Sequence, residues 1–201
     1  MVRHRPVRPG GLYAPCKRLV DLVAALVLIV GLLPLFVVVA IAIPLDSPGS
    51  PLFFQVRVGR GGRPFRIWKF RTMRRDAPRT GPELTQAGDP RITRLGRWLR
   101  RMSVDELPQL VNILLGHMSF IGPRPEVPSL VESAWSDEDR ALVLAVRPGL
   151  SGWAQIHGRD DLDIPAKLAY DRAYVRALGP GIDFKILLAT PGVLLGGAGI
   201  K

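Results

Sequence analysis

The feature that most constrains this chain is an uncharged stretch of 24 residues from Leu22 to Leu45, LVAALVLIVGLLPLFVVVAIAIPL. As one straight helix it would be roughly 36 Å long, enough to cross a hydrocarbon core of about 30 Å. It is too long for the apolar core of a secretory signal, and no small-residue cleavage site follows it. The stretch therefore predicts a membrane element.

Two features bear on how this stretch lies in a membrane. Gly31 and Pro34 fall near its centre, and a proline inside a helix removes a backbone hydrogen bond and kinks the helix. Both flanks are basic, because residues 1–18 carry five Lys or Arg and residues 47–75 carry eight, with no acidic residue in either segment. Basic loops stay on the cytoplasmic side, so a helix that breaks at Leu33 and Pro34 and returns to the same side satisfies both flanks. We favour this re-entrant helical hairpin, with a single span as the alternative.

The charge of the chain points to a polyanionic partner. Lys and Arg number 28 against 17 Asp and Glu, which gives a formal net charge of +11. Such a charge fits nucleic acid, an anionic membrane surface or phosphorylated substrates, and does not choose among them. The single cysteine, Cys16, excludes an intramolecular disulfide, and the three scattered histidines show no zinc-ligand spacing.

The rest of the chain alternates short strand and helix patterns. FFQVRV and RPFRIWKFRTM, separated by GRGG at residues 59–62, predict a β-hairpin, and the polar residues 75–90 predict a loop. Residues 91–102 predict an amphipathic helix, either packed on the core or lying in the headgroup layer with Trp98 near the interface. Its apolar face would hold Ile92, Leu95, Trp98, Leu99 and Met102. Further helices are expected at residues 107–115, 136–146 (begun by Ser136 as cap), 164–178 and 184–195.

These patterns predict an α+β fold that is mostly helical. We expect a monotopic membrane protein with a Pro-broken re-entrant helical hairpin, a small β-hairpin and amphipathic interfacial helices. The expected divisions are a basic N-terminal tail at 1–16, the re-entrant membrane helix at 17–46 and a catalytic domain at 47–201 on the cytoplasmic face.

The strongest local signal for chemistry is SVDELP at residues 103–108. Ser103 with Glu106 matches a capping box, and Asp105 is an alternative cap. Either way, two adjacent carboxylates lie at a helix N-terminus among many arginines, which favours their ionised forms. That environment suits a carboxylate nucleophile or a magnesium ligand. From the local sequence alone, capping is the more common role.

A second signal is GPRP at residues 122–125, where the prolines hold Arg124 on a rigid loop and its guanidinium can clamp a phosphate. Arg147 is followed by Pro148 and is expected to be held in the same way. Lys69 and Arg71 on the predicted hairpin are further candidates for phosphate contacts. The simpler interpretation of each is a surface cation on a stiff segment.

Taken in order, these segments resemble the bacterial sugar transferase family, the monotopic polyprenyl-phosphate phosphoglycosyl transferases. The matching segments are KRLVD at 17–21, KFRTM at 69–73, SVDELPQLVN at 103–112, MSFIGPRP at 118–125, RPGLSGWAQ at 147–155, GR at 158–159, YD at 170–171 and YV at 174–175. They cover nearly the whole chain after residue 16, corresponding to the family's catalytic core alone.

The resemblance implies a re-entrant helix broken at Pro34, a UDP-sugar donor, Mg²⁺, an undecaprenyl-phosphate acceptor and release of UMP. It makes Asp105 and Glu106 the catalytic pair and the metal ligands, with Asp105 as the nucleophile of a two-step, ping-pong transfer. With Asp171, the residues expected to bind substrate are Lys69, Arg71, Arg124 and Arg147. The expected location is the cytoplasmic face of a bacterial inner membrane, in contact with phospholipids and without nucleic acid, and a homodimer is compatible with it.

This chain departs from the family pattern at three positions. Leu33 stands where the family often has Ser before the helix-breaking proline, His117 where an acid is common, and His157 where Asn is common. Two other function classes also fit the residues. A membrane-anchored basic module binding lipid or nucleic acid needs only the charge, and a metal-dependent phosphohydrolase would use the same carboxylates with water as acceptor.

Overall fold

The computed structural model describes residues 11–77 and 88–196. Most of the predicted basic tail and residues 78–87 of the predicted loop lie outside this part of the chain. The helices are α1 (Tyr13–Gly31), α2 (Leu33–Asp46), α4 (Arg94–Arg101), α5 (Gln109–Leu114), α6 (Pro128–Ala134), α7 (Asp137–Val143), α8 (Trp153–Ile156), α9 (Ile164–Arg176) and α10 (Pro180–Gly196). The strands are β1 (Leu52–Val58), β2 (Pro64–Phe70), β3 (Ser119–Ile121) and β4 (Gly149–Ser151), with short 3₁₀ turns at Arg60–Gly62, Val104–Glu106 and Arg159–Asp161.

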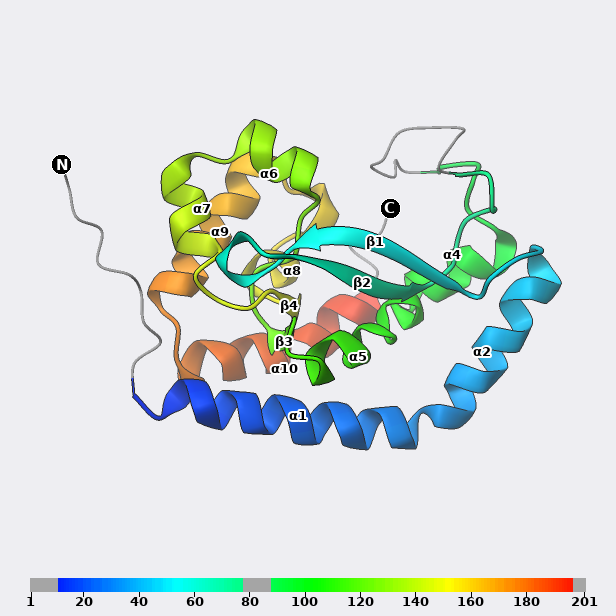
Figure 1. Ribbon diagram of the computed structural model, residues 1–201, viewed down its shortest axis with the longest axis horizontal. Coiled ribbons are helices and arrows are strands. Elements are labelled where there is room, and N and C mark those ends of the chain that lie inside the picture. The colour runs from blue at the N-terminus through cyan, green and yellow to red at the C-terminus, as the bar shows by residue number, and fades with distance from the viewer. Residues whose placement is uncertain (1–10, 78–87, 197–201) are drawn as a thin grey trace.

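The uncharged stretch forms two helices that meet at a bend. α1 and α2 are bent by 61° relative to each other at Leu32, and their diverging axes are plain in Figure 1. Pro34 lies in the first turn of α2, where a missing N–H has no helical partner to lose. The break expected at Leu33 and Pro34 is therefore present within one residue of its predicted place.

The length and apolar composition of the described helices decide whether they could cross a bilayer. In residues 11–77 and 88–196, no single helix is both long and apolar enough, whereas α1 and α2 together satisfy length and composition as a broken span or a re-entrant loop. Many apolar side chains on α2 and α10 face outward rather than into the core, among them Val38, Ile41, Leu187 and Leu188.

The predicted β-hairpin is confirmed. β1 and β2 pair antiparallel from Leu52 opposite Phe70 to Val58 opposite Pro64, and the turn between them uses two glycines with positive φ, Gly61 and Gly62. The hairpin lies across α5 and α1 (Figure 1). One core cluster joins Phe65 and Ile67 of β2 to Ala25 of α1 and to Leu110, Ile113 and Met118. The hairpin therefore ties the bent helix pair to the rest of the fold.

A second, parallel strand pair was not predicted. Ser119 and Ile121 of β3 pair with Gly149 and Ser151 of β4, which brings the GPRP and RPGLSG segments side by side. Three glycines permit this approach. A Cβ atom on Gly149 would lie 2.1 Å from the backbone nitrogen of Gly122, and one on Gly152 would lie 2.1 Å from the carbonyl oxygen of Gly122.

Most predicted helices are confirmed, with shorter bounds. Ser136 caps α7 by accepting a hydrogen bond from the backbone of Asp139 at 3.1 Å, as expected. The amphipathic helix begins later than predicted because Thr93 is its cap, so Ile92 precedes it. Leu99 is fully buried, whereas Trp98 is 51% exposed. The five apolar residues therefore do not share one buried face.

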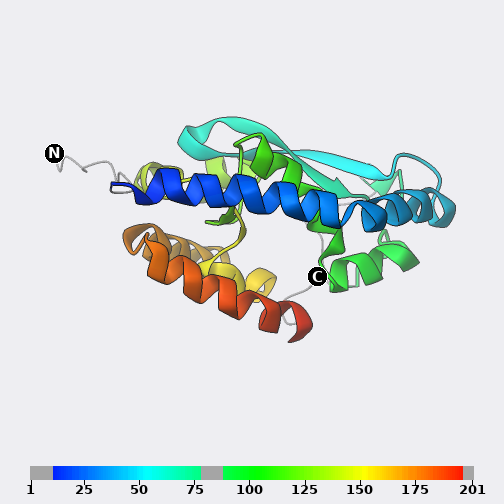
Figure 2. The ribbon, with the colours of Figure 1, turned by 90° about the horizontal axis from the view of Figure 1, so that it is seen from below.

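The helices pack around the two strand pairs in a flat arrangement. α1 and α10 run side by side along one face of the molecule, as Figures 1 and 2 both show. α6, α7 and α9 lie at one end, and α2 with α4 lies at the other. The 3₁₀ turn Val104–Glu106 joins α4 to α5 beside the end of β2, and this is where the predicted carboxylates lie.

Candidate active site

The turn that carries the two carboxylates is not a helix cap. Ser103 adopts a left-handed conformation (φ 52°) and its side chain forms no capping hydrogen bond. α5 begins later, with Pro108 at the N-cap position, so neither Ser103 nor Asp105 caps it. The capping interpretation is therefore wrong, because the left-handed residue turns the chain before the helix starts. Asp105 and Glu106 are instead buried, at 8% and 9% exposure.

Glu106 is held by two cations from different parts of the fold. Nζ of Lys69, at the end of β2, lies 2.7 Å from Oε1 of Glu106, and Nη2 of Arg124 lies 3.0 Å from the same oxygen. Burial alone would raise the pKa of this carboxyl, but Arg124 and Lys69 outweigh burial and lower it. Glu106 is therefore ionised at neutral pH, and it fixes the positions of both cations.

Asp105 differs from its neighbour in having no salt bridge among the described residues. Burial raises the pKa of its carboxyl to about 6, Lys69 opposes the rise and the charge of Glu106 adds to it. A buried carboxylate that is ionised at neutral pH but tied to no cation is free to form a new bond. Adjacent carboxyls with pKa values pushed apart in this way are typical of catalytic pairs.

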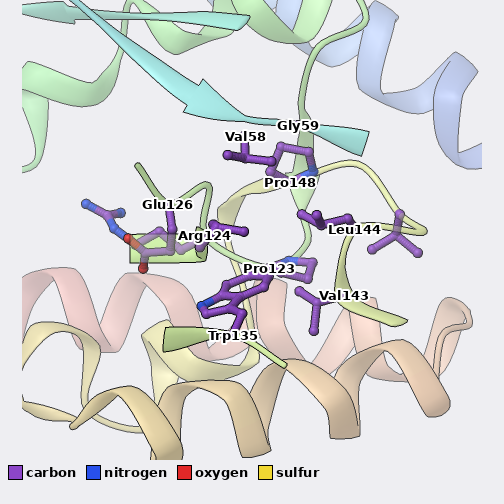
Figure 3. A pocket seen from close by; sticks show the side chains of 11 residues that line it. Val58, Gly59, Pro123, Arg124, Glu126, Trp135, Val143, Leu144 and Pro148 are labelled. Carbon is purple, nitrogen blue, oxygen red and sulfur yellow. The ribbon is translucent and has the colours of Figure 1, made fainter. Parts of the chain in front are cut away.

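Arg124 is positioned by the loop predicted to be stiff. Pro123 and Pro148 line one small pocket together with Val143, Leu144 and Trp135. Figure 3 shows Arg124 and Glu126 together on one side of this pocket, apart from Val143 and Leu144. The apolar packing around the prolines fixes the backbone from which Arg124 reaches Glu106.

A small polar cavity lies on another side of Arg124. It is lined by Arg124, Glu126, Ala154, Gln155, Arg159, Lys167 and Asp171. Four buried side-chain atoms around it have no hydrogen-bond partner among residues 11–77 and 88–196, namely both amide atoms of Gln155, Nη1 of Arg159 and Oδ1 of Asp171. Since buried polar atoms are nearly always paired, this group indicates a site for a ligand with both donors and acceptors.

Asp171, predicted to bind substrate, thus lies in a cavity that shares Arg124 with the carboxylate site. Burial and the charge of Glu126 raise the pKa of its carboxyl to about 7, against the opposing effect of Lys167. Gln155 and Arg159 belong to segments quoted for the family resemblance, but neither was singled out as a candidate. Local sequence carried no sign that their side chains would be buried without partners.

Two predicted phosphate-binding arginines lie elsewhere. Arg71 donates through Nη1 to the carbonyl of Pro48 at 3.0 Å and through Nη2 to the carbonyl of Ser47, which ties β2 to the segment after α2. Arg147 donates through Nε to the carbonyl of Gly116 at 3.0 Å. The structure therefore brings Lys69, Arg124, Asp105 and Glu106 together, with Asp171 nearby, and does not bring Arg71 or Arg147 to the same carboxylates.

No cluster of three or more His, Cys, Asp or Glu side chains suited to a metal ion occurs in residues 11–77 and 88–196. The adjacent oxygens of Asp105 and Glu106 remain the hard donors of this site, and Mg²⁺ is usually bound by one or two carboxylates together with substrate phosphates. The donor set of the site therefore fits magnesium when a phosphorylated substrate is bound.

Comparison with known proteins identifies relatives along almost the whole chain. Residues 12–197 match the family described as bacterial sugar transferase. A UDP-N-acetylgalactosamine-undecaprenyl-phosphate N-acetylgalactosaminephosphotransferase of Aeromonas hydrophila is 40% identical over 96% of this chain and 47% of its own length. A UDP-glucose:undecaprenyl-phosphate glucose-1-phosphate transferase of Caulobacter vibrioides is 42% identical over 94% of this chain and 75% of its own.

A third relative is close to this chain in length. The exopolysaccharide production protein PSS of Rhizobium leguminosarum bv. phaseoli is 41% identical over 87% of this chain and 92% of its own length. By contrast, the chain spans about half the length of the Aeromonas protein. The named sugars differ between relatives, so similarity does not select one sugar.

Proposed function

The chain belongs to the bacterial sugar transferase family, and on this premise we propose that it transfers a sugar-1-phosphate from a UDP-sugar to a polyprenyl phosphate such as undecaprenyl phosphate. The products are a polyprenyl-diphospho-sugar and UMP, in the first membrane step of glycoconjugate or exopolysaccharide assembly. One observation carries the proposal: Asp105 is buried and has no salt bridge among the described residues, beside a Glu106 held by Lys69 and Arg124.

The pair supports a two-step displacement. In the first step a carboxylate oxygen of Asp105 attacks the sugar-bearing phosphorus of the donor, the bond from that phosphorus to the UMP oxygen breaks, and UMP leaves. In the second step an oxygen of the lipid phosphate attacks the same phosphorus, the bond to Asp105 breaks, and the carboxylate is regenerated. No oxidant or further reactant is needed.

The cations around Glu106 have a separate role. Lys69 and Arg124 are fixed by Glu106 within a buried site, where charged groups act more strongly than in water. We expect them to stabilise negative charge that develops on the transferred phosphoryl group and on UMP. Magnesium held by Asp105, Glu106 and the donor phosphates would add to this neutralisation.

The cavity of Gln155 and Asp171 supports a binding site for the polar part of the donor. Its unpartnered atoms include both hydrogen-bond donors and acceptors, which suit the hydroxyl groups of a sugar or the edge of a uracil ring. Because Arg124 lines this cavity and also contacts Glu106, a donor bound there would have its diphosphate directed toward Asp105.

The bent helix pair supports monotopic association of the protein with the cytoplasmic face of the bacterial inner membrane. α1 and α2 would enter the bilayer and return to the same side, with the outward-facing apolar side chains of α2 and α10 in contact with lipid. The carboxylates would then lie at the depth where a soluble nucleotide and a lipid phosphate can meet.

The test is covalent labelling with a panel of radiolabelled UDP-sugars and magnesium, in the absence of lipid acceptor. UDP-glucose and UDP-N-acetylgalactosamine are the first donors to include. We expect label on the native protein and on Asp137→Asn, whose carboxylate is on the surface, and none on Asp105→Asn. Undecaprenyl phosphate should remove the label as lipid-linked product.

Other outcomes separate the alternatives. Product formation without prior labelling of the protein would indicate direct transfer from the UDP-sugar to the lipid phosphate, without an aspartyl intermediate. Loss of the sugar phosphate to water, with no lipid-linked product, would favour the phosphohydrolase. Equal labelling of Asp105→Asn and native protein would remove Asp105 from the mechanism.

A further inference from the structure

A cavity of about 60 Å³ lies at the N-terminal end of α1. It shares no lining residue with the polar cavity beside Arg124, and none of Lys69, Asp105 and Glu106 lines it. About 10–15 Å³ on this measure holds one water molecule, so there is room for a group of four or five heavy atoms. The first turns of α1, the hairpin turn and the loop before β4 form its walls.

Three arginines from these different elements line the cavity. Arg18 donates to the carbonyls of Ile113 and Leu114 at 2.7 and 3.1 Å, and Arg147 donates through Nε to the carbonyl of Gly116 at 3.0 Å. Both guanidinium groups are thus anchored at the C-terminal end of α5. Arg60 reaches the cavity from the turn of the β-hairpin.

The positive charge in this cavity is only partly balanced. Lys17, which also lines it, forms an ion pair with Asp183, whose carboxylate also accepts from the hydroxyl of Tyr174. Asp21 accepts a hydrogen bond from the backbone of Phe120 at 3.2 Å. Among the described residues no salt bridge joins Arg18, Arg60 or Arg147 to a carboxylate. Burial, followed by the neighbouring charges of Arg18 and Arg60, lowers the pKa of Arg147.

One residue that lines this space has a buried hydroxyl without a partner among the described residues. Ser119 lines the cavity and is 1% exposed, and its Oγ has no hydrogen-bond partner in the part of the chain that the structure describes. A buried hydroxyl is normally satisfied by the protein or by a bound group. Three guanidinium groups and one free hydroxyl around a space of this size match the oxygens of a phosphate.

The position of the cavity along α1 indicates where such a phosphate would come from. Lys17, Arg18 and Asp21 occupy the turns next to the cavity, and the uncharged stretch begins at the following residue, Leu22. If α1 enters the bilayer at this point, the cavity lies at the level of the lipid headgroups, where basic side chains meet anionic lipid.

We propose that this cavity binds the phosphate group of an anionic membrane phospholipid, with Arg18, Arg60, Arg147 and Ser119 as its ligands. The bound headgroup would fix α1 at the membrane surface. Arg147 is then a phosphate ligand, as its sequence context suggested, but of a structural lipid and not of the nucleotide donor. The inference rests on the membrane association proposed above and is independent of the transfer chemistry.

The experiment uses the full chain, purified in a neutral detergent, with short-chain phosphatidylglycerol, phosphatidylcholine or inorganic phosphate as the added probe. Binding is measured by native mass spectrometry and by the shift in Tm. Arg60→Gln is the main variant, because Arg60 is exposed and its side chain forms no hydrogen bond or ion pair in the described part of the chain. Arg63→Gln, an equal change of charge on the same hairpin but outside the cavity, is the matched control.

We expect phosphatidylglycerol to bind the native protein and Arg63→Gln equally and to raise their Tm more than phosphatidylcholine does. Arg60→Gln should bind it about tenfold more weakly. Ser119→Ala, which removes only an unpartnered hydroxyl, should also weaken binding while leaving the lipid-free Tm near the native value.

Equal binding of the two phospholipids, or native affinity in both Arg60→Gln and Ser119→Ala, would overturn the proposal. Inorganic phosphate that matches the Tm shift and displaces phosphatidylglycerol would overturn the lipid assignment in favour of a free-phosphate site. Covalent labelling of Asp105 is measured on the same native sample, so failure of the transfer reaction and failure of lipid binding are read separately.

Discussion

Nζ of Lys69 lies 2.7 Å from Oε1 of Glu106, although the two residues are 37 positions apart in the chain. Their side chains are 17% and 11% exposed, so the contact lies in a largely dry part of the fold. With Arg124 on the same oxygen, it keeps Glu106 ionised and leaves the neighbouring Asp105 as the carboxyl whose pKa is raised to about 6.

The first prediction concerns the pH dependence of covalent labelling. Asp105 must be ionised to attack, and its pKa is raised to about 6, so the labelling rate should fall about tenfold per pH unit well below pH 6. Glu106→Gln removes a charge that raises this pKa and releases Lys69 and Arg124 to stabilise the Asp105 carboxylate. The acid limb of single-turnover labelling should therefore move to lower pH in Glu106→Gln, and a shift to higher pH would contradict the assignment.

The second prediction concerns stability. The pKa of Asp105 is higher in the folded protein than the ordinary value of 3.8, so the folded state binds more protons between these two values. Stability contributed by this group consequently falls as pH rises from about 4 to about 6. Asp105→Asn, which cannot ionise, should raise Tm relative to the native protein at pH 8, and this difference should vanish near pH 4. Asp137→Asn serves as the control, and an equal gain there would assign the effect to surface charge.

The third prediction tests the polar cavity. Gln155→Met keeps the approximate volume of the side chain and removes two amide atoms that have no hydrogen-bond partner among the described residues. The apparent KM for the UDP-sugar should rise about tenfold, because polar groups of the bound UDP-sugar would be buried without hydrogen bonds. Tm and the KM for the polyprenyl phosphate should stay near their native values. A lower Tm without a change in the KM for the UDP-sugar would show that Gln155 has a structural role and does not bind the UDP-sugar.

The fourth prediction tests the parallel strand pair. A Cβ atom at residue 149 would meet the backbone nitrogen of Gly122 at 2.1 Å, and backbone cannot move aside as a flexible side chain can. Gly149→Ala should therefore lower the free energy of unfolding by about 3 kcal/mol or more. Gly192→Ala in α10 is the control, since nothing lies within 4 Å of its Cβ position. Chemical denaturation of both variants measures the difference.

Features that depend on neighbouring residues were predictable from the sequence. The break in the apolar stretch follows from Pro34, the hairpin from two strand patterns around a glycine-rich turn, and the start of α7 from Ser136. Asp105 and Glu106 were identified as a candidate pair because two adjacent carboxylates lie among many arginines, and the family resemblance favoured catalysis over capping. The prediction of a capping box at Ser103 and Glu106 was wrong. The two residues have the spacing of a capping box, but the left-handed backbone of Ser103 excludes one.

Features that depend on distant residues appeared only in the folded chain. The β3–β4 pair joins segments about 30 residues apart through glycines whose role is close approach, which no local pattern reveals. Asn112 can be fully buried because its side-chain amide accepts a hydrogen bond from the backbone N–H of Trp68 and donates one to the carbonyl of Arg66, which offsets the cost of burying a polar group. Arg124 and Arg147 look alike in sequence, each beside a proline, yet one meets Glu106 and the other Gly116. The sequence by itself determined where the chain bends and supplied the candidates for chemistry, since both follow from residue type and local backbone preference. Only the tertiary structure decided which of the candidate charges share a site, because that depends on packing between segments far apart in the chain.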